Sequence, residues 1–443
     1  MRRDDVVLEV VRHHAVTIDD ESAAAHLLDA IDPAATVVLI GESTHGTREF
    51  YRYRADVTRA LIERRGFGLV AVEADWPDAY RANRWGRGLG HDATAEQALE
   101  DFTRFPRWMW RNREVVRFLR WLKAANADRT PEAQIGFYGL DLYSLHRSMA
   151  QVIDYLDRVD PNAARQARRG YACFDAFGDD VQLYGYAASL NLRRSCEDEA
   201  VEQLVQLQRR AAEYASRDGQ VAADDYFVAE QNARVVRNAE EYYRAMFRGG
   251  VESWNVRDRH MMDTLVTLVE HTAQRGRSAK TVVWAHNSHL GDARATTMGD
   301  AGELNLGQLA SQHFGAACCA VGLTTYEGEV TASHEWDEPA ALRQVQPSLP
   351  GSYERLFHDT GLPAFVLPLG DAAVAAALAG PRPERAIGVI YRPETERASH
   401  YFAARLPKQF AVVVHVDRTH AVEPLERWGR HEVDLPETYP TGV

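Results

Sequence analysis

The sequence predicts an α/β protein whose mostly parallel sheet is flanked by helices. Short apolar runs rich in β-branched residues recur near both ends of the chain, as expected for buried strands. Long helical patterns separate the early runs, and this alternation is typical of parallel sheets. A central stretch differs, because its apolar residues recur at three and four spacing and it contains no strand pattern. These three observations define the expected architecture.

Eight runs are expected to form strands. They cover residues 36–41, 68–73, 134–140, 281–286, 318–324, 363–368, 385–391 and 410–416. Helical patterns occupy 48–66 and 108–127 between the early runs, and 196–217 and 222–247 within the central stretch.

The central stretch divides the predicted core into two parts. Residues 1–144 and 276–443 are expected to form the α/β core, and residues 145–275 an inserted helical lid or subdomain. Ligands of open parallel sheets bind at the carboxyl ends of the strands. Since the strands before and after the insertion both lead to that edge, we expect the inserted helices to lie over it.

Composition limits the classes of partner. The 443 residues include 51 Lys and Arg against 64 Asp and Glu, a net charge of −13, and no dense basic block interleaved with aromatics occurs. A nucleic-acid partner is therefore not expected. No run approaches the roughly 18 apolar residues of a membrane helix, and the acidic start does not resemble a signal peptide. We expect a soluble cytoplasmic protein with no membrane partner, of undetermined oligomeric state.

The four cysteines are expected to be reduced and mostly buried. They are Cys173, Cys196, Cys318 and Cys319. None forms a C-x-x-C pair, and reduced thiols are usual in the cytoplasm.

Polar side chains, all but one of them titratable, follow three predicted strands at the points where the strands end. They are Glu42 and His45 after the first run, Glu73 and Asp75 after the second, and His286, Asn287 and His289 after the fourth. Because the carboxyl ends of parallel strands meet at one edge, these groups are expected to form one site. Clustered titratable groups are typical of functional sites, so the pattern predicts an enzyme.

The segment from Gly41 to His45 begins like the G-x-S-x-G nucleophile elbow. His45 stands where the tight turn needs its second glycine, and this argues against Ser43 as a nucleophile. His286 and His289 could contribute to a metal site, but their spacing in a loop is not diagnostic. A metal-dependent hydrolase and a non-catalytic small-molecule binding protein remain alternatives. No cofactor or resident metal is predicted.

At these residues the sequence resembles the erythromycin esterase family. The resemblance is carried by Ile40-Gly-Glu-Ser-Thr-His-Gly-Thr-Arg-Glu-Phe, by Arg54, by Val72-Glu-Ala-Asp-Trp, by Gly139-Leu-Asp141 and by Trp284-Ala-His-Asn-Ser-His-Leu-Gly. It extends from about residue 35 to about residue 420. Residues 391–402 resemble esterase-like members more than the macrolide-resistance enzymes, so a macrolide is not the favoured substrate.

The resemblance implies hydrolysis of a small-molecule ester or lactone without a covalent intermediate. It places the general base on His45 and the other active-site groups on Glu42, Arg54, Glu73, His286 and His289. Either Glu42 or Glu73 would orient the His45 imidazole, as the acid does in a serine triad. Oxyanion donors would come from His286, His289 or Arg54. We expect Asp75, Asn287 and Asp141, at the same strand ends, to contact the substrate.

Overall fold

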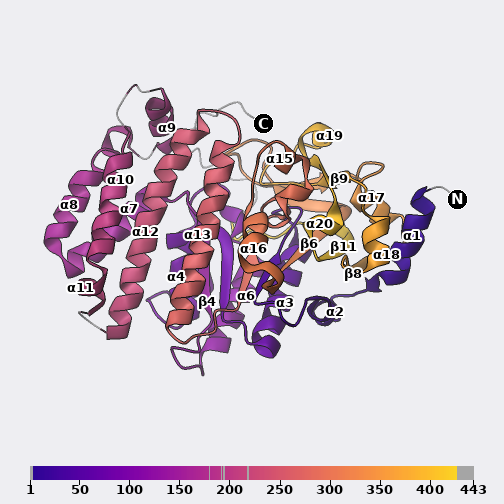
Figure 1. Cartoon of the computed structure of the whole chain (residues 1–443), viewed down its shortest axis with the longest axis horizontal. Coiled ribbons are helices and arrows are strands. Elements are labelled where there is room, and N and C mark those ends of the chain that lie inside the picture. The colour runs from indigo at the N-terminus through magenta and orange to yellow at the C-terminus, as the bar shows by residue number, and fades with distance from the viewer. Residues whose placement is uncertain (1–2, 179, 191, 193–194, 217–218, 427–443) are drawn as a thin grey trace.

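A nine-stranded sheet forms the centre of the computed structural model, which describes residues 3–178, 180–190, 192, 195–216 and 219–426 (Figure 1). The strands are β1 Val16–Thr17, β2 Val37–Ile40, β3 Leu69–Asp75, β4 Gly136–Asp141, β5 Thr281–Trp284, β6 Cys318–Ala332, β7 Ala341–Val345, β8 Ala364–Pro368, β9 Arg382–Arg385, β10 Tyr401–Ala404 and β11 Val412–Thr419. The sheet order is β1-β8-β11-β6-β2-β5-β3-β4, with β7 paired to β6, while β9 and β10 form a separate two-stranded sheet.

The middle of this sheet is parallel, as the sequence predicts. β2 pairs in parallel with β5 and β6, and β3 does so with β5 and β4. All four residues of β2 and of β5 are buried, because helices cover both faces of a parallel sheet and the strands read as continuous apolar runs. β1, β7 and β8 join the sheet through antiparallel pairs at its periphery.

Helices surround the sheet. They are α1 Arg3–His14, α2 Ala23–Ala30, α3 Arg48–Arg65, α4 Trp76–Gly86, α5 Ala95–Ala98, α6 Arg113–Asn126, α7 Leu145–Val159, α8 Pro161–Tyr171, α9 Val181–Ser189, α10 Glu197–Arg209, α11 Ala211–Ser216, α12 Gly219–Met246, α13 Glu252–Gln274, α14 Asn287–Leu290, α15 Thr297–Asp300, α16 Leu306–Phe314, α17 Tyr353–His358, α18 Ala372–Ala377, α19 Glu396–Ser399 and α20 Leu406–Gln409. Within the described residues, no helix combines the length and apolar character needed to cross a membrane.

Local chemistry explains where the long helices begin and end. α3 stops at Gly66, whose φ of 68° lies in the left-handed region that glycine adopts most easily. α6 starts later than the sequence pattern predicts. The Asn112 side chain accepts a hydrogen bond from the Val115 N–H at 2.9 Å, and this cap fixes the first turn at Arg113.

The helices from α7 to α13 stand beside the β4 end of the sheet, and α1 lies at the opposite end of the molecule (Figure 1). Among the described residues of this segment there is no strand, and α7, α8, α9, α10 and α12 pack around their own apolar core. α13 connects this layer to the sheet, because it contacts both α12 and β4. The segment reaches the carboxyl ends of the strands through the first turns of α13.

Two expectations about individual elements are wrong. The run 385–391 is not a regular strand: β9 ends at Arg385, and the following residues form isolated bridges through Ile387 and Ile390. The run is apolar because Ile387 and Tyr391 pack in one cluster with residues of β6 and β7, and this packing does not require a strand ladder. β1, β7 and β10 were not expected, since two of them are short and β7 is half exposed, so none carries a buried apolar run.

The expectation of four reduced cysteines is also wrong. Cys173 and Cys196 form a disulfide, with their Cα atoms 5.9 Å apart. The two residues are 23 positions apart in sequence, and the packing of α8, α9 and α10 brings them within the range that a disulfide requires. This proximity arises from helix packing and has no signature in the spacing. Cys318 and Cys319 are free thiols.

Candidate functional site

The loop from Gly41 to Thr47 connects β2 to α3 and is packed tightly on every side. A Cβ at Gly41 would overlap the Asn287 side chain, and one at Gly46 would overlap the backbone of Thr331 in β6. Two backbone hydrogen bonds join the loop to Ile387. The Ile387 N–H donates to Ser43 O at 2.8 Å, and the Ile387 carbonyl accepts from the His45 N–H at 3.3 Å. Thr47 occupies the N-cap position of α3, but its hydroxyl contacts that of Thr44 instead of capping the helix.

Glu42 orients His45. Nδ1 of His45 lies 3.0 Å from Glu42 Oε1, and the other carboxylate oxygen lies 2.7 Å from Nη2 of Arg54. Arg54 is fully buried and its guanidinium also lies over the rings of Tyr51 and Trp284, at 4.5 and 5.3 Å. Because an ionised carboxylate can only accept, Nδ1 of His45 carries the proton. Among the described residues no group hydrogen-bonds Nε2 of His45, so its lone pair is available.

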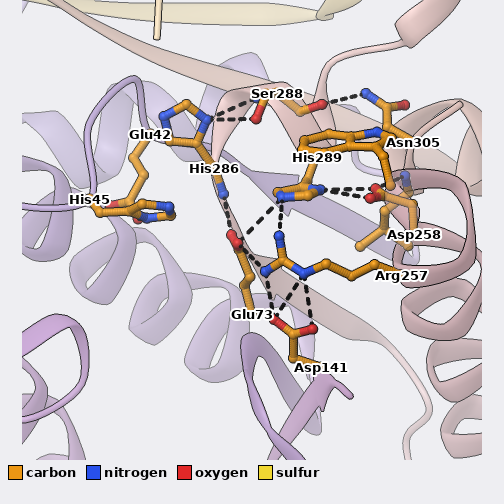
Figure 2. A network of polar contacts seen from close by, with 12 residues as sticks. Glu42, His45, Glu73, Asp141, Arg257, Asp258, His286, Ser288, His289 and Asn305 are labelled. Atoms are coloured by element: carbon orange, nitrogen blue, oxygen red, sulfur yellow. Dashed lines mark hydrogen bonds and ion pairs between the residues drawn. The ribbon is translucent and has the colours of Figure 1, made fainter. Parts of the chain in front are cut away.

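His286 lies beside His45, with the ring centroids 4.9 Å apart (Figure 2). Nδ1 of His286 accepts from the Ser288 N–H at 3.2 Å, so in the neutral ring the proton is on Nε2. Burial, reinforced by the nearby His45, lowers the pKa of His286 to about 3 and keeps the ring neutral. In the part of the chain that the structure describes, Nε2 of His286 is buried and makes no hydrogen bond of normal geometry, although the Ser43 backbone interacts with the ring and partly opposes the fall in its pKa.

Glu73 stands between these two histidines and a second group of charges (Figure 2). Its Oε2 accepts from the His286 backbone N–H at 2.8 Å, and its Oε1 lies 2.7 Å from Nη2 of Arg257. Burial alone would raise the pKa of Glu73. His289, Arg257, His45 and the His286 N–H outweigh burial, so the pKa lies well below its usual range and the carboxylate is ionised.

Arg257 contacts Glu73, Asp141 and His289 at the ends of the strands. Its Nε lies 3.0 Å and its Nη2 2.6 Å from the carboxylate of Asp141, a fork-like contact, and its Nη1 lies 2.9 Å from Nε2 of His289. Its guanidinium also lies over the Tyr143 ring at 5.0 Å. The pKa of Arg257, which burial lowers, is raised well above its usual value by Asp141, Tyr143 and Glu73. A permanently charged group therefore sits at the centre of the network.

His289 is held on both ring nitrogens. Nδ1 lies 2.9 and 3.0 Å from the two oxygens of Asp258, and Asp258 also accepts from the Leu306 N–H at the start of α16. Burial lowers the pKa of His289, but Asp258 and Glu73 raise it to above its ordinary value. Nε2 also lies 3.4 Å from Oε1 of Glu73, a contact that favours the protonated ring, whereas the shorter contact of 2.9 Å with Arg257 requires the neutral ring because a guanidinium can only donate. We therefore assign the Nδ1–H form to this geometry. The ring stacks on Trp254 at 4.4 Å.

Arg257 and Asp258 were missed in the sequence. Both belong to α13, in the segment whose helical periodicity was recognised, but a charged residue on an amphipathic helix is by default a solvated one. No motif surrounds them. One feature of the sequence could have indicated them. The predicted strand ends carry carboxylates with no predicted cationic partner, and the inserted helices were expected to lie over those strand ends.

The structure brings Glu42, His45, Arg54, Glu73, His286 and His289 to one edge of the sheet. The three residues expected to contact the substrate lie at the same edge, and each is already engaged. Asp141 is bound to Arg257. Asp75 lies 3.2 Å from Arg104, and Asn287 bonds the backbone of Leu323 through both ends of its amide, at 3.0 and 3.4 Å.

The donor set is arranged for acid–base chemistry. Within the described residues no group of three or more His, Cys, Asp or Glu side chains is placed to hold a metal ion. Arg54 and Arg257 also lie against Glu42, Glu73 and Asp141, so the carboxylates that a cation would use already face guanidinium groups.

Comparison with known proteins points to one family. The family model described as erythromycin esterase matches residues 62–419. The curated relatives include "Erythromycin esterase type II" of Escherichia coli, 25% identical over 350 residues, covering 74% of this chain and 78% of the relative. They also include "Putative hydrolase YbfO" of Bacillus subtilis, 21% identical over 378 residues, covering 80% of this chain and 79% of the relative.

Solved structures share the fold. A protein from Bacillus cereus superposes with a TM-score of 0.75 at 17% identity, covering 96% of this chain and 99% of that one. A succinoglycan biosynthesis protein gives 0.73 at 20% identity, with coverages of 95% and 98%. An erythromycin esterase mutant, EreC, in its open conformation gives 0.62 at 17% identity, with coverages of 87% and 91%. Because the family model spans most of the sequence, this chain belongs to the erythromycin esterase family and is a hydrolase of the esterase type.

Proposed function

We propose that the protein hydrolyses an ester or lactone of a small molecule with water that His45 activates. The observation that carries this proposal is the Glu42–His45 contact of 3.0 Å at Nδ1, which leaves Nε2 as a free base at the carboxyl edge of the sheet. A neutral imidazole is well matched to accepting a proton from water near neutral pH, and a positioned base contributes roughly 10²–10⁴-fold.

In the proposed reaction, water gives a proton to Nε2 of His45 while its oxygen bonds to the carbonyl carbon of the substrate. The tetrahedral intermediate then expels the alkoxide by breaking the ester C–O bond, and the imidazolium returns the proton to that oxygen. Glu42 stabilises the imidazolium that forms between the two steps, and Arg54 holds the Glu42 carboxylate in place. No covalent bond to the protein is needed, and Ser43 has no part in the reaction.

His286 is the proposed oxyanion donor. Its neutral ring carries a buried proton on Nε2 that makes no hydrogen bond of normal geometry, and a poorly satisfied buried donor is costly unless a ligand accepts from it. A neutral imidazole can polarise a carbonyl in this way without competing with His45 for the proton. One preorganised donor of this kind is worth roughly 3–4 kcal/mol of transition-state stabilisation.

The remaining charged groups act through these two histidines. Glu73 holds the backbone of His286, while Arg257, Asp141, Asp258 and His289 fix the position of Glu73. We propose that Asp75, Asp141 and Asn287 position the site without touching the substrate, since the partners described above already engage their side chains. The ester class of the substrate rests on membership of the family.

The test is His45→Asn in a screen of esters and lactones of varied ring size. Asparagine fills a similar space but cannot take the proton, so kcat should fall by at least about 10²-fold while KM stays near the wild-type value. His313→Asn, on the exposed end of α16, is the matched control and should keep full activity. A folded His45→Asn protein that turns over at the wild-type rate would contradict the proposal. Loss of activity on chelation, with recovery on adding zinc, would point to the metal-dependent alternative.

A further inference from the structure

A cavity of about 320 Å³ lies at the opposite edge of the sheet from His45. It is formed where β3 and β4 begin and where α4, α6 and α13 end. The residues used in the following argument are Phe67, Arg87, Arg129, Glu132, Tyr138 and Arg277. Glu73 at the site lies four positions after Leu69 at this cavity, which is roughly 13 Å along an extended strand. A ligand bound here would not occupy the catalytic site.

The cavity concentrates positive charge. Arg87, Arg129 and Arg277 line it, each half-buried, and Glu132 is the carboxylate among the described lining residues. Three arginines against one carboxylate leave an excess of two positive charges, in a chain whose net charge is −13. Across the described residues, none of the three arginines has a carboxylate within ion-pair distance, although most arginines near the catalytic edge do.

Helix ends account for part of this arrangement. Cations are favoured near helix C-termini, and Arg129 donates to the carbonyls of Ala125 and Ala133 at 3.0 and 3.3 Å. Arg277 donates from Nη2 to the carbonyl of Pro131, and Arg87 from Nε to the side chain of Gln134 at 3.2 Å. In the described structure, Nε of Arg277 is buried and has no acceptor. These carbonyl and amide contacts therefore leave at least one buried guanidinium donor unsatisfied.

Arg87 and Arg277 also repel one another. The pKa of Arg277 is lowered, first by burial and then by the charge of Arg87. Asp224, the acidic neighbour that opposes this effect, is bound to Arg275 at 2.8 Å and to His271 at 3.2 Å. An anion between the two guanidiniums would relieve the repulsion and accept from Nε of Arg277. Guanidinium groups suit this because their fork of donors matches the oxygens of phosphate and carboxylate.

We propose that this cavity binds a phosphorylated small molecule, with its phosphate between Arg87 and Arg277 and its organic part against Tyr138 and Phe67. A phosphate monoester carries close to two negative charges at neutral pH, and this matches the excess of two positive charges. A volume of about 320 Å³ lies at the lower end of the range for small-ligand pockets and leaves room for a ring beside the phosphate.

The experiment is calorimetric titration of the full chain in chloride buffer with three probes: phenyl phosphate, inorganic phosphate and phthalate. Phthalate is an aromatic dianion without phosphate, so it separates phosphate recognition from carboxylate recognition. The variants are Arg277→Gln and Arg87→Gln. The matched control is Arg117→Gln, which removes a charge from an arginine on α6 that is 63% exposed and paired with Glu114. His45→Asn locates binding relative to the catalytic site.

Phenyl phosphate is expected to bind with one-to-one stoichiometry, more tightly than either inorganic phosphate or phthalate. Arg277→Gln and Arg87→Gln should each weaken binding at least tenfold, whereas Arg117→Gln and His45→Asn should leave it unchanged. If Arg277→Gln does not fold, as judged by circular dichroism, Arg87→Gln decides the result. No saturable binding, equal affinity in the lining variants, equal affinity for phthalate, or loss in His45→Asn would each overturn the proposal.

Discussion

Replacing Arg257 with methionine should destabilise the protein more than any single surface change. The substitution keeps much of the side-chain volume but leaves Glu73 and Asp141 without their cation, and these side chains are 3% and 4% exposed. Removing one partner of a buried ion pair costs about 3–5 kcal/mol. Arg257 itself is 13% exposed, which admits some solvent, so we expect a loss near the lower limit, about 3 kcal/mol.

The free energy of unfolding from urea titration measures this loss. A double-mutant cycle with Asp141→Asn tests the cause of this loss. The second change removes one of the two carboxylates left without a cation, so it should restore about 1–2 kcal/mol of the free energy of unfolding. Arg355→Met is the matched control on α17, where the arginine pairs with Asp359 one turn away at 2.9 Å and both side chains are exposed. That change should cost well under 1 kcal/mol. If Arg257→Met and Arg355→Met cost the same, the reasoning about the buried network is wrong.

Three further predictions concern the site and the helical segment. Glu42→Gln should lower kcat by roughly 10²–10⁴-fold with little change in KM, because an amide can turn its NH₂ towards Nδ1 and displace the proton to Nε2; a near-normal kcat would show that Glu42 does not orient His45. The folded-state pKa of His286 is about 3 against an ordinary 6.5, so the unfolded chain binds more protons between these values and stability falls with decreasing pH. The loss from pH 7 to pH 5 should be about 2 kcal/mol larger in the wild type than in His286→Asn, measured by urea unfolding at both values; equal losses would contradict the neutral assignment. Reducing Cys173–Cys196, or replacing Cys173 with serine, should cost about 3 kcal/mol in the helical segment while Cys318→Ser leaves the effect of reductant unchanged, as followed by thermal unfolding with and without dithiothreitol.

The parts of the fold that the sequence predicts are those with a strong local signal. β2, β3 and β5 are buried on both faces, so each reads as an apolar run, and the polar residues that follow mark the strand ends. The family resemblance added Arg54, which by itself looks like a solvated helix residue. Its burial depends on Tyr51 and Trp284, and Trp284 is distant in sequence.

The parts that could not be predicted depend on how distant segments pack. Arg257 contacts Asp141 and Glu73 because α13 crosses the strand ends. The sequence around Arg257 contains no motif that predicts this crossing. Cys173 and Cys196 meet for the same reason. The residues after Arg385 looked like a strand because they are apolar, whereas their contact with the His45 loop determines their path. The role of the helical segment as a lid remains a prediction.

The absence of side chains at Gly41 and Gly46 has a consequence for how such an enzyme could diversify. Asn287 and Thr331 fill the space that a Cβ at these two positions would need, so close packing fixes the loop that carries His45, the proposed base. This loop cannot shift to accommodate a larger substrate unless α14, which carries Asn287, and β6, which carries Thr331, are rebuilt as well. We therefore expect new specificities to arise on the α13 side of the site, while His45, the proposed proton acceptor, stays where the packing of its loop places it.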